Sequence, residues 1–125
     1  MSILICPNCK SRLYREEGSF LCKHGHRFDL SSSGYLHLLP SNHMRSKIPG
    51  DNKQMVKARR DFLTKGYYQP ISDLLNREVL RFCKRGTELQ VLDAGCGEGY
   101  YTQRLAEAMQ ADGLSFQITG LDISK

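Results

Sequence analysis

The sequence predicts an α/β protein in two parts, a small β-hairpin module followed by the first part of a domain with a parallel sheet. Two observations support this prediction. Cysteine and histidine residues recur at short, regular spacings near the N-terminus, which is typical of a small module held together by a metal. Further along, the stretch QVLDAGCGEGYY at 90–101 joins a strand, a glycine-rich turn and a helix start, as at the opening of a Rossmann-like domain.

The N-terminal cysteines and histidines follow a zinc-ligand pattern. Cys6 and Cys9 form a C-x2-C pair, and Cys22 and His26 complete the spacing C-x2-C-x12-C-x3-H. A C-x2-C turn places two thiolates on one side of a knuckle, and a second pair on a neighbouring hairpin completes the tetrahedron that Zn²⁺ prefers. His24 competes with His26, but its C-x-H spacing leaves little chain to turn the imidazole back to the metal. Because four protein ligands leave no open position, the expected Zn²⁺ is structural.

Two alternatives to zinc remain open at this point. Disulfide pairing would require an oxidising compartment, and the sequence shows no basic start followed by an apolar segment that would indicate secretion. A thioredoxin-type redox pair would require a βαβ context, which residues 1–40 lack. Residues 12–21 instead predict two short strands around a turn at 16–19, which is the hairpin that a zinc site needs.

Composition and turn residues divide the chain into three segments. We expect a zinc-binding module at 1–38, a basic linker rich in helix breakers at 39–50, and the N-terminal part of a Rossmann-like domain at 51–125. His37 and His43 are expected to be surface residues without a metal.

Helical periodicity predicts two helices before the glycine-rich turn. The first begins at Asp51, which with Gln54 resembles a capping box, and ends at Gly66. The second has Pro70 in its first turn and ends before Gly86. Its expected buried stripe consists of Ile71, Leu74, Leu75, Val79 and Phe82. A third helix at 100–110 and a strand at 116–123 are expected to follow the turn.

The glycine-rich turn has the form D-x-G-x-G-x-G, made by Asp93, Gly95, Gly97 and Gly99. Its glycines let the backbone pass close to a ligand, and the strand before it is expected to be buried. A dinucleotide fingerprint would read G-x-G-x-x-G, so a pyrophosphate ligand is the weaker interpretation. The form resembles motif I of class I S-adenosylmethionine (SAM)-dependent methyltransferases. Asp122 ends the next strand, where a carboxylate can accept hydrogen bonds from ribose hydroxyls. A turn without a ligand and an exposed aspartate are the plain structural alternatives.

The charge of the chain is unevenly placed. The net charge of +5 divides into +4 for residues 1–47, +3 for 48–66 and −2 for 67–125. This division predicts that the N-terminal half meets a polyanion while the rest handles a small molecule, although a solvated basic surface would give the same pattern. No apolar run is long enough to span a membrane, so we expect no membrane partner and a cytoplasmic location.

Together, these features resemble the RlmA family of 23S rRNA guanine-N1-methyltransferases. The resemblance extends over the whole chain and rests on CPNC with Cys22 and His26, HMRSKIPGD, ARRDFL, GYYQP, VLDAGCGEGYYT and GLDISK. It implies that Cys6, Cys9, Cys22 and His26 bind Zn²⁺. It also implies that Tyr68, Gly97 and Glu98 contact SAM, with Asp93, Gly95, Gly99 and Asp122 around them.

The resemblance implies a fold and a function for the longer protein. The zinc module would grip a 23S rRNA hairpin beside a Rossmann-like SAM-dependent methyltransferase domain, commonly in a homodimer. The residue that accepts the N1 proton of guanine would follow a fourth strand, which this chain lacks, so no catalytic residue is assigned. We therefore expect an N-terminal fragment that is inactive by itself. A zinc-dependent RNA-binding module without catalysis and a small-molecule SAM methyltransferase are the alternatives.

Overall fold

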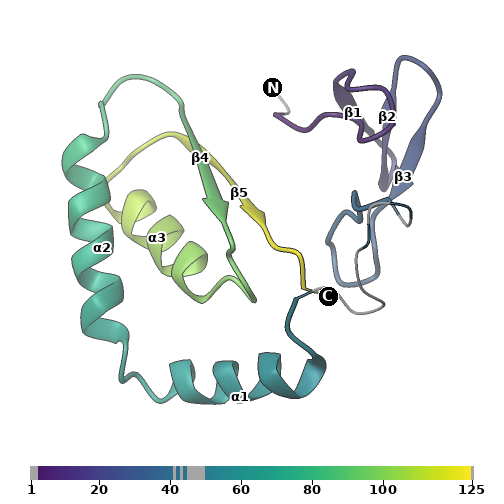
Figure 1. The fold of residues 1–125 in the computed structure, drawn as a ribbon. Helices are drawn as coiled ribbons and strands as arrows, with labels where there is room; N and C mark the ends of the chain where they lie inside the picture. Colours follow the sequence, from purple (N-terminus) through teal and green to yellow (C-terminus); the bar gives the residue numbers. More distant parts are fainter. Residues whose placement is uncertain (1–2, 41, 43, 45–49, 125) are drawn as a thin grey trace. The chain divides into compact units, whose positions relative to one another are not determined.

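The computed structural model describes residues 3–40, 42, 44 and 50–124 (Figure 1). The chain divides into two compact units, Met1–Lys47 and Ile48–Lys125. Residues 41, 43 and 45–49 of the expected 39–50 linker, His43 among them, lie outside the described residues.

The first unit contains a three-stranded antiparallel sheet in the order β1 (Leu13–Glu16), β2 (Ser19–Cys22) and β3 (Arg27–Asp29). The predicted hairpin is confirmed, because Glu16 pairs with Ser19 and leaves a two-residue turn. Both turn residues have positive φ, 31° at Glu17 and 80° at Gly18, which matches the right-handed twist of the strands. Strand β3 was not predicted, because three residues are too few to show an alternating pattern.

The core of this unit is made largely by the expected metal ligands. Cys6, Leu13 and Cys22 are buried together, and the half-buried side chains around them are Leu4, Cys9, Phe20, Phe28, Leu36 and Leu38. An isolated bridge between Leu30 and Leu36 brings the segment after β3 back to this core. So small an apolar core stabilises little by itself, which is why a metal would contribute directly to folding.

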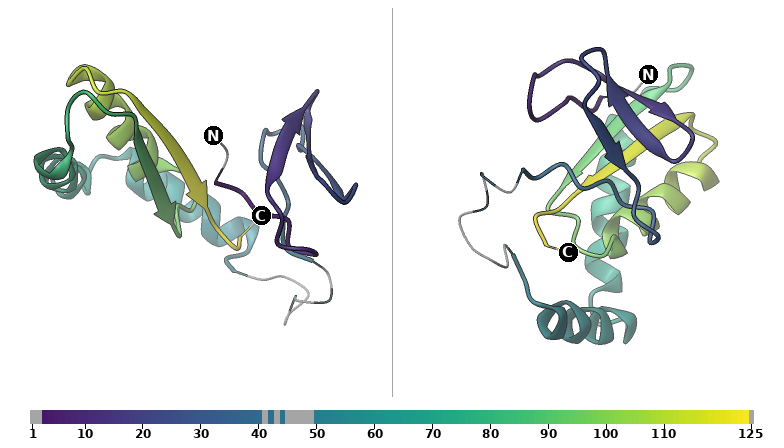
Figure 2. Two further views of the ribbon diagram at one scale, coloured as in Figure 1. Left: turned by 90° about the horizontal axis from the view of Figure 1, so that it is seen from above. Right: turned by 90° about the vertical axis from the view of Figure 1, so that its right-hand side faces the viewer.

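The second unit contains α1 (Lys53–Thr64), α2 (Gln69–Phe82), β4 (Leu89–Ala94), α3 (Tyr100–Ala111) and β5 (Phe116–Leu121). Strands β4 and β5 are parallel, in a register that runs from Leu89 opposite Phe116 to Ala94 opposite Leu121. Helix α3, whose Met109 is buried, connects the two strands and packs on β5, and α2 packs on α3 (Figure 2). The carboxyl ends of both strands therefore lie at the same edge, where the glycine-rich turn begins.

The first two helices form where the sequence predicts them, but one cap differs. Asn52, and not Asp51, caps α1, because its Oδ1 accepts a 2.9 Å hydrogen bond from the Met55 N–H. The Asp51 carboxylate instead pairs with Arg59, with 2.6 Å between Oδ2 and Nη1. Pro70 lies in the first turn of α2 as predicted.

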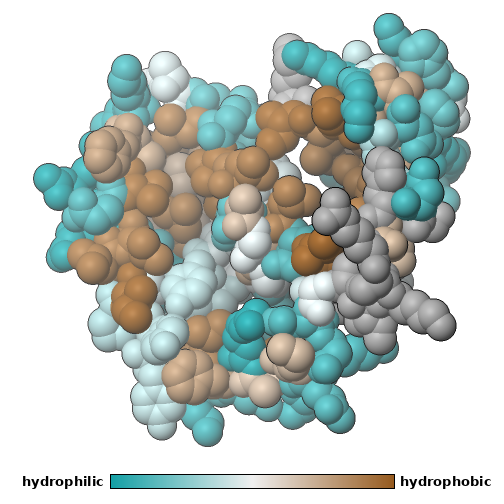
Figure 3. All heavy atoms as spheres, viewed as in Figure 1, coloured by the Kyte–Doolittle hydropathy of each residue, from teal (hydrophilic) through white to brown (hydrophobic). Residues whose placement is uncertain are grey.

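The predicted buried stripe of α2 is wrong. Ile71, Leu74 and Leu75 are about half exposed, and Phe82 is 84% exposed. Figure 3 shows this apolar surface over α2. The helix turns a polar face to α3 instead: the buried Ser72 accepts a 2.8 Å hydrogen bond from Arg104 Nε, and Asn76 Nδ2 donates to the Arg104 carbonyl. An arginine in the contact requires polar partners, and Ser72 and Asn76 provide them on the face of α2 that meets α3.

The strand before the glycine-rich turn is also more open than expected. Side chains alternate along β4, with Val91 half-buried and Leu92 56% exposed. Among the residues that the structure describes, no helix is both long and apolar enough to cross a bilayer.

Candidate metal centre and cofactor cleft

The four side chains expected to bind zinc lie together in the N-terminal unit. The ligand atoms of Cys6, Cys9, Cys22 and His26 are all within 4.8 Å of one another. His26 Nδ1 is 3.3 Å from Cys22 Sγ and 3.6 Å from Cys6 Sγ, and the Cys9 and Cys22 sulfurs are 3.6 Å apart. Ligands of a tetrahedral Zn²⁺ with Zn–S bonds of about 2.3 Å are separated by about 3.7 Å, so these residues are positioned to bind a metal ion.

Two tight turns bring the ligands together. In the first, Lys10 N–H donates to the Cys6 carbonyl over 2.8 Å, and Lys10 takes a left-handed φ of 62° to close the turn. In the second, Cys22 N–H donates to the His26 carbonyl and Gly25 N–H to the Cys22 carbonyl, both over 3.0 Å. This second turn directs His26 inward and leaves His24 exposed, as its spacing predicts.

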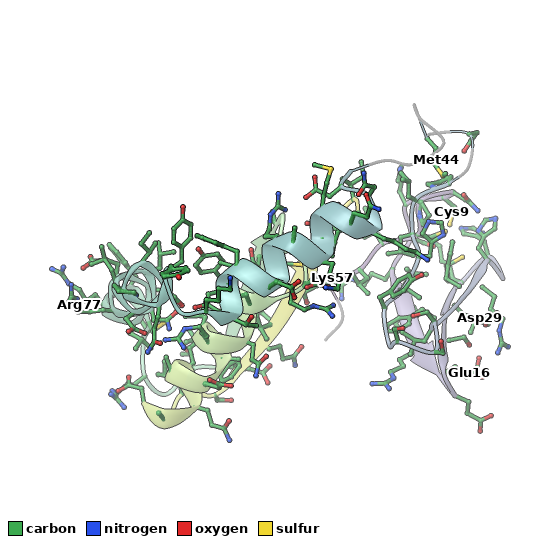
Figure 4. All side chains as sticks on the ribbon, turned by 90° about the horizontal axis from the view of Figure 1, so that it is seen from below. Cys9, Glu16, Asp29, Met44, Lys57 and Arg77 are labelled. Atoms are coloured by element: carbon green, nitrogen blue, oxygen red, sulfur yellow. The ribbon has the colours of Figure 1, made fainter. Side chains whose placement is uncertain are left out.

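The surroundings of Cys9 favour the thiolate that Zn²⁺ requires. The Ser11 hydroxyl lies 3.0 Å from Cys9 Sγ. This hydrogen bond is the main reason that the pKa of the Cys9 thiol is lowered to about 6. Hydrogen bonds with Cys9 and Cys22 raise the pKa of His26. Figure 4 labels Cys9, which lies in the turn before β1. The donor set and its local charges therefore fit a zinc ion.

The glycine-rich turn has the backbone that its sequence predicts. Gly95, Gly97 and Gly99 have φ values of 88°, 55° and 86°, in the left-handed region that favours glycine. A Cβ atom placed at any of the three would meet no heavy atom within 4 Å. These glycines are thus required by backbone conformation, and the space beside them is open to a ligand.

The end of β5 holds this turn in place. The N–H groups of Gly95 and Cys96 donate to the Leu121 carbonyl over 2.6 and 3.1 Å. Asp122 Oδ2 accepts a 2.7 Å hydrogen bond from Gly97 N–H, and its Oδ1 accepts one from Ser124 N–H. The backbone hydrogen bond from Ser124, together with that from Gly97, lowers the pKa of the Asp122 carboxyl. Asp122 therefore lies beside the turn, where the sequence places it, and supports the turn directly.

A cleft of about 800 Å³ lies between α1 and the glycine-rich turn, within the size range of small-molecule sites. Of the residues expected at the cofactor, Gly95, Gly97 and Glu98 line it. Its other lining residues are Asp51, Lys53, Val56, Lys57, Arg59, Arg60, Asp61, Leu63, Thr64, Cys96, Tyr100, Tyr101, Gln103 and Ser124. The open space at the glycines and the mixture of charged, polar and aromatic side chains fit SAM.

The other expected cofactor residues, Tyr68, Asp93, Gly99 and Asp122, do not line this cleft. Asp93 accepts a hydrogen bond from the Thr102 hydroxyl, which fixes its carboxylate against the first turn of α3. Gly99 is the N-cap of α3. Tyr68 precedes α2, and its ring meets the Phe62 ring edge-on, with 5.1 Å between the centroids.

Sequence reasoning missed the wall that α1 contributes to the cleft. The basic residues of α1 offered one signal, but their charge predicted contact with a polyanion or a solvated basic surface. In the structure, Lys57 pairs with Asp61 and Arg59 with Asp51, while Arg60 pairs with Glu98 across the cleft. These charges are thus largely engaged inside the unit.

Both units match known protein families. Residues 4–47 match the family described as RlmA, N-terminal, which is a zinc ribbon, and residues 86–125 match a methyltransferase domain family. The first match covers the metal centre, and the second covers β4, the glycine-rich turn, α3 and β5.

Curated relatives match the chain from end to end. It is 33% identical over 98% of its length to a 23S rRNA (guanine(748)-N(1))-methyltransferase of Streptomyces fradiae, covering 41% of that protein. It is 32% identical over 98% to a putative 23S rRNA (guanine-N(1)-)-methyltransferase of Micromonospora griseorubida, covering 44%. A protein of Bacillus subtilis (strain 168) with the same putative activity is 33% identical over 99%, covering 43%. The chain spans about two fifths of the length of these relatives. Residues 4–47 are therefore an RlmA-type N-terminal zinc ribbon, and residues 86–125 belong to a methyltransferase domain.

Proposed function

We propose that this chain is the N-terminal part of a SAM-dependent methyltransferase that methylates N1 of a guanine in 23S rRNA. The observation that carries the proposal is the presence, on one chain, of an RlmA-type zinc ribbon and an open glycine-rich turn beside a cleft. The similarity to rRNA guanine-N1-methyltransferases runs through both units and supports the same substrate.

Each expected site residue has a role in this proposal. Gly95, Gly97 and Gly99 let the backbone approach the cofactor, and Tyr68 and Glu98 contact it. Asp93 and Asp122 hold the turn, and the Asp122 carboxylate is the acceptor proposed for ribose hydroxyls. Bound SAM would supply an electrophilic methyl group for an in-line displacement. We assign no residue of this chain to removal of the N1 proton.

The zinc ribbon is the proposed rRNA-binding part. Residues 1–47 carry a net charge of +4, which suits a phosphate backbone. RNA hairpins are recognised by shape, phosphate contacts and unstacked bases, so a small basic module can position a loop while a separate cleft holds the cofactor. We propose a 23S rRNA hairpin as the partner, a homodimer as the state of the longer protein, and the cytoplasm as its location.

The test compares 23S rRNA from cells with and without the full-length gene that carries these residues. Methylation of N1 blocks Watson–Crick pairing, so a reverse-transcription stop at one guanine should disappear on deletion and return when the gene is restored. Restoration with a Gly97→Val variant is the matched control and should fail. An unchanged pattern of stops after deletion would contradict the proposal.

The same experiment separates the main alternative. A zinc-dependent RNA-binding module without catalysis would bind 23S rRNA fragments yet leave no methylated guanine. The 125-residue chain itself is expected to transfer no methyl group from labelled SAM and to bind SAM weakly at most. If the longer protein methylates a small molecule, the chain should show no affinity for rRNA even at low salt. If it binds rRNA, its affinity for rRNA should fall steeply as the salt concentration rises.

A further inference from the structure

Helix α1 contacts two of the expected cofactor residues at once. The Arg60 guanidinium binds the Glu98 carboxylate in the glycine-rich turn, and the Phe62 ring packs on Tyr68 at the start of α2. Glu98 and Tyr68 belong to separate segments of the second unit. A single helix therefore joins them.

The contact between Arg60 and Glu98 is bidentate. Arg60 Nε donates to Oε2, and Nη2 donates to Oε1, so the planar guanidinium faces the planar carboxylate. Paired hydrogen bonds of this kind fix direction as well as distance, which a single ion pair does not. Glu98 lies between Gly97 and Gly99, both with left-handed φ, so its own backbone neighbours add no side chain to hold it.

Other basic side chains of α1 are held differently. Lys57 pairs with Asp61 one turn along the same helix, with 2.9 Å between Nζ and Oδ2. Arg59 pairs with Asp51, just before the helix. These pairs are local to α1 and its entry, whereas Arg60 reaches a residue 38 positions away.

The start of α1 is fixed at the same edge of the sheet. Asp51 N–H donates a 3.0 Å hydrogen bond to Ser124 Oγ, two residues after Asp122. A Cβ atom at Gly50 would lie 2.4 Å from that same Oγ, so the chain passes very close to the end of β5. Because α1 buries no side chain, these contacts, and not a hydrophobic core, determine where it lies.

We propose that Arg60 is a positioning residue of the cofactor cleft: its two hydrogen bonds to Glu98 hold the glycine-rich turn against α1, which forms the second wall of the site. Phe62 acts in the same way on Tyr68. This inference rests on the proposed function, because it takes SAM as the ligand of the cleft. Arg60 itself is assigned no contact with the reacting atoms.

The test uses Arg60→Lys, which keeps the positive charge but cannot form two parallel hydrogen bonds with a carboxylate. SAM binding to the full-length protein that carries these residues is measured by equilibrium dialysis, and exchange of the Gly97, Glu98 and Gly99 amide hydrogens is measured without ligand. Arg60→Lys should weaken SAM binding by about tenfold and speed this exchange. Arg81→Gln is the control, because it removes an arginine paired with Glu78 inside α2 and should change neither quantity.

A double-mutant comparison shows whether Arg60 acts through Glu98. In a Glu98→Gln background, the further change Arg60→Lys should alter SAM affinity by less than about twofold. If Arg60 only supported the fold, the effects of Arg60→Lys and Glu98→Gln on SAM affinity would be additive. Arg60→Lys would then lower SAM affinity by the same factor in the wild-type and in the Glu98→Gln background.

The outcomes separate this inference from the proposed function. If the wild-type full-length protein binds SAM and its Arg60→Lys variant binds SAM equally well, the inference fails and the function stands. If the wild-type full-length protein binds no SAM at millimolar ligand, the proposed function loses its support, and the amide exchange measured without ligand tests the inference. Faster exchange at Gly97–Gly99 in Arg60→Lys, but not in Arg81→Gln, supports the positioning role, and unchanged exchange overturns it.

Discussion

The Asp122 carboxylate accepts a hydrogen bond from the Gly97 N–H over 2.7 Å, so the residue that ends β5 holds the turn that follows β4. Its second oxygen accepts from the Ser124 N–H, also over 2.7 Å. One side chain thus fixes two backbone segments at the carboxyl edge of the sheet. Both terminal atoms of the side chain must therefore accept a hydrogen bond. The two oxygens of a carboxylate can do so, whereas the amide of asparagine has only one acceptor oxygen.

Replacing Asp122 with Asn should therefore loosen the turn. The amide nitrogen would face a backbone N–H, and we expect the free energy of unfolding of residues 48–125 to fall by about 1 kcal/mol. Urea denaturation at neutral pH measures this change. Asp29→Asn, which removes an exposed pair with Arg27 in the other unit, is the control and should have almost no effect on this transition.

The contribution of Asp122 to the free energy of unfolding should depend on pH with a defined sign. Hydrogen bonds from Ser124 and Gly97 lower the pKa of Asp122 in the folded chain. The stabilisation is therefore complete above the pKa that Asp122 has in the unfolded chain, and it is lost as the pH falls through its pKa in the folded chain. The Gly97 amide resonance should titrate with a midpoint below 3.8, the ordinary value for this carboxyl. A midpoint at or above that value would contradict the role given to these hydrogen bonds.

Zinc binding should depend on His26 and not on His24. His26→Ala removes one of four ligands and should abolish stoichiometric binding, whereas His24→Ala should retain about one zinc per chain. Metal analysis of the purified variants measures this. Chelation of the wild-type chain should remove the ordered signals of residues 3–40 while those of residues 50–124 persist, because so small a core depends on the metal. Equal zinc content in both histidine variants would disprove the assignment.

Ser11 should tune the metal centre without binding the metal. Its hydroxyl is 3.0 Å from Cys9 Sγ, and a hydrogen bond to a ligating thiolate orients and stabilises it. Ser11→Ala should weaken zinc binding by about tenfold in competition with a chelator, the lower end of the range for such partners. Ser11→Thr keeps the hydroxyl and should restore the affinity. Equal affinity in the alanine variant would show that the contact plays no part in binding.

The close contact between Cys96 and Gly120 should make the effect of a substitution at Gly120 on stability depend on the side chain at position 96. A Cβ atom at Gly120 would lie 2.8 Å from Cys96 Sγ, so Gly120→Ala should displace the sulfur and destabilise the turn by about 1 kcal/mol. In a Cys96→Ala background, the same change should cost clearly less, because the sulfur is absent. Urea denaturation of the four proteins measures the difference, and equal costs in both backgrounds would contradict this contact.

Local sequence signals predicted the metal module and the order of elements well. The ligand spacing placed the zinc residues together, and the positive φ values of Gly95, Gly97 and Gly99 follow from a turn that only glycine forms easily. The first helix was found within two residues of its ends and the second within three, since their periodicity and breakers lie within or next to the helix itself. Strand β3 was missed because three residues carry too little pattern.

Predictions that depended on tertiary partners were less successful. The apolar stripe of α2 was expected to be buried, but Arg104 on α3 selects the polar face of α2 through Ser72 and Asn76. Periodicity shows that a helix has two faces, and it does not show which one meets a given neighbour. The capping box at Asp51 failed for the same reason, because Arg59 draws the Asp51 carboxylate away and Asn52 takes the cap.

The sequence by itself determined the chemistry of both sites, because ligand spacing, turn residues and strand ends are properties of a few neighbouring positions. Tertiary structure decided which side chains share the cofactor cleft. The contact between Arg60 and Glu98 joins residues 38 positions apart, and the Asp122 carboxylate reaches a turn 25 positions before it. Such contacts depend on how the helices cross the end of the sheet, and no local pattern encodes that geometry.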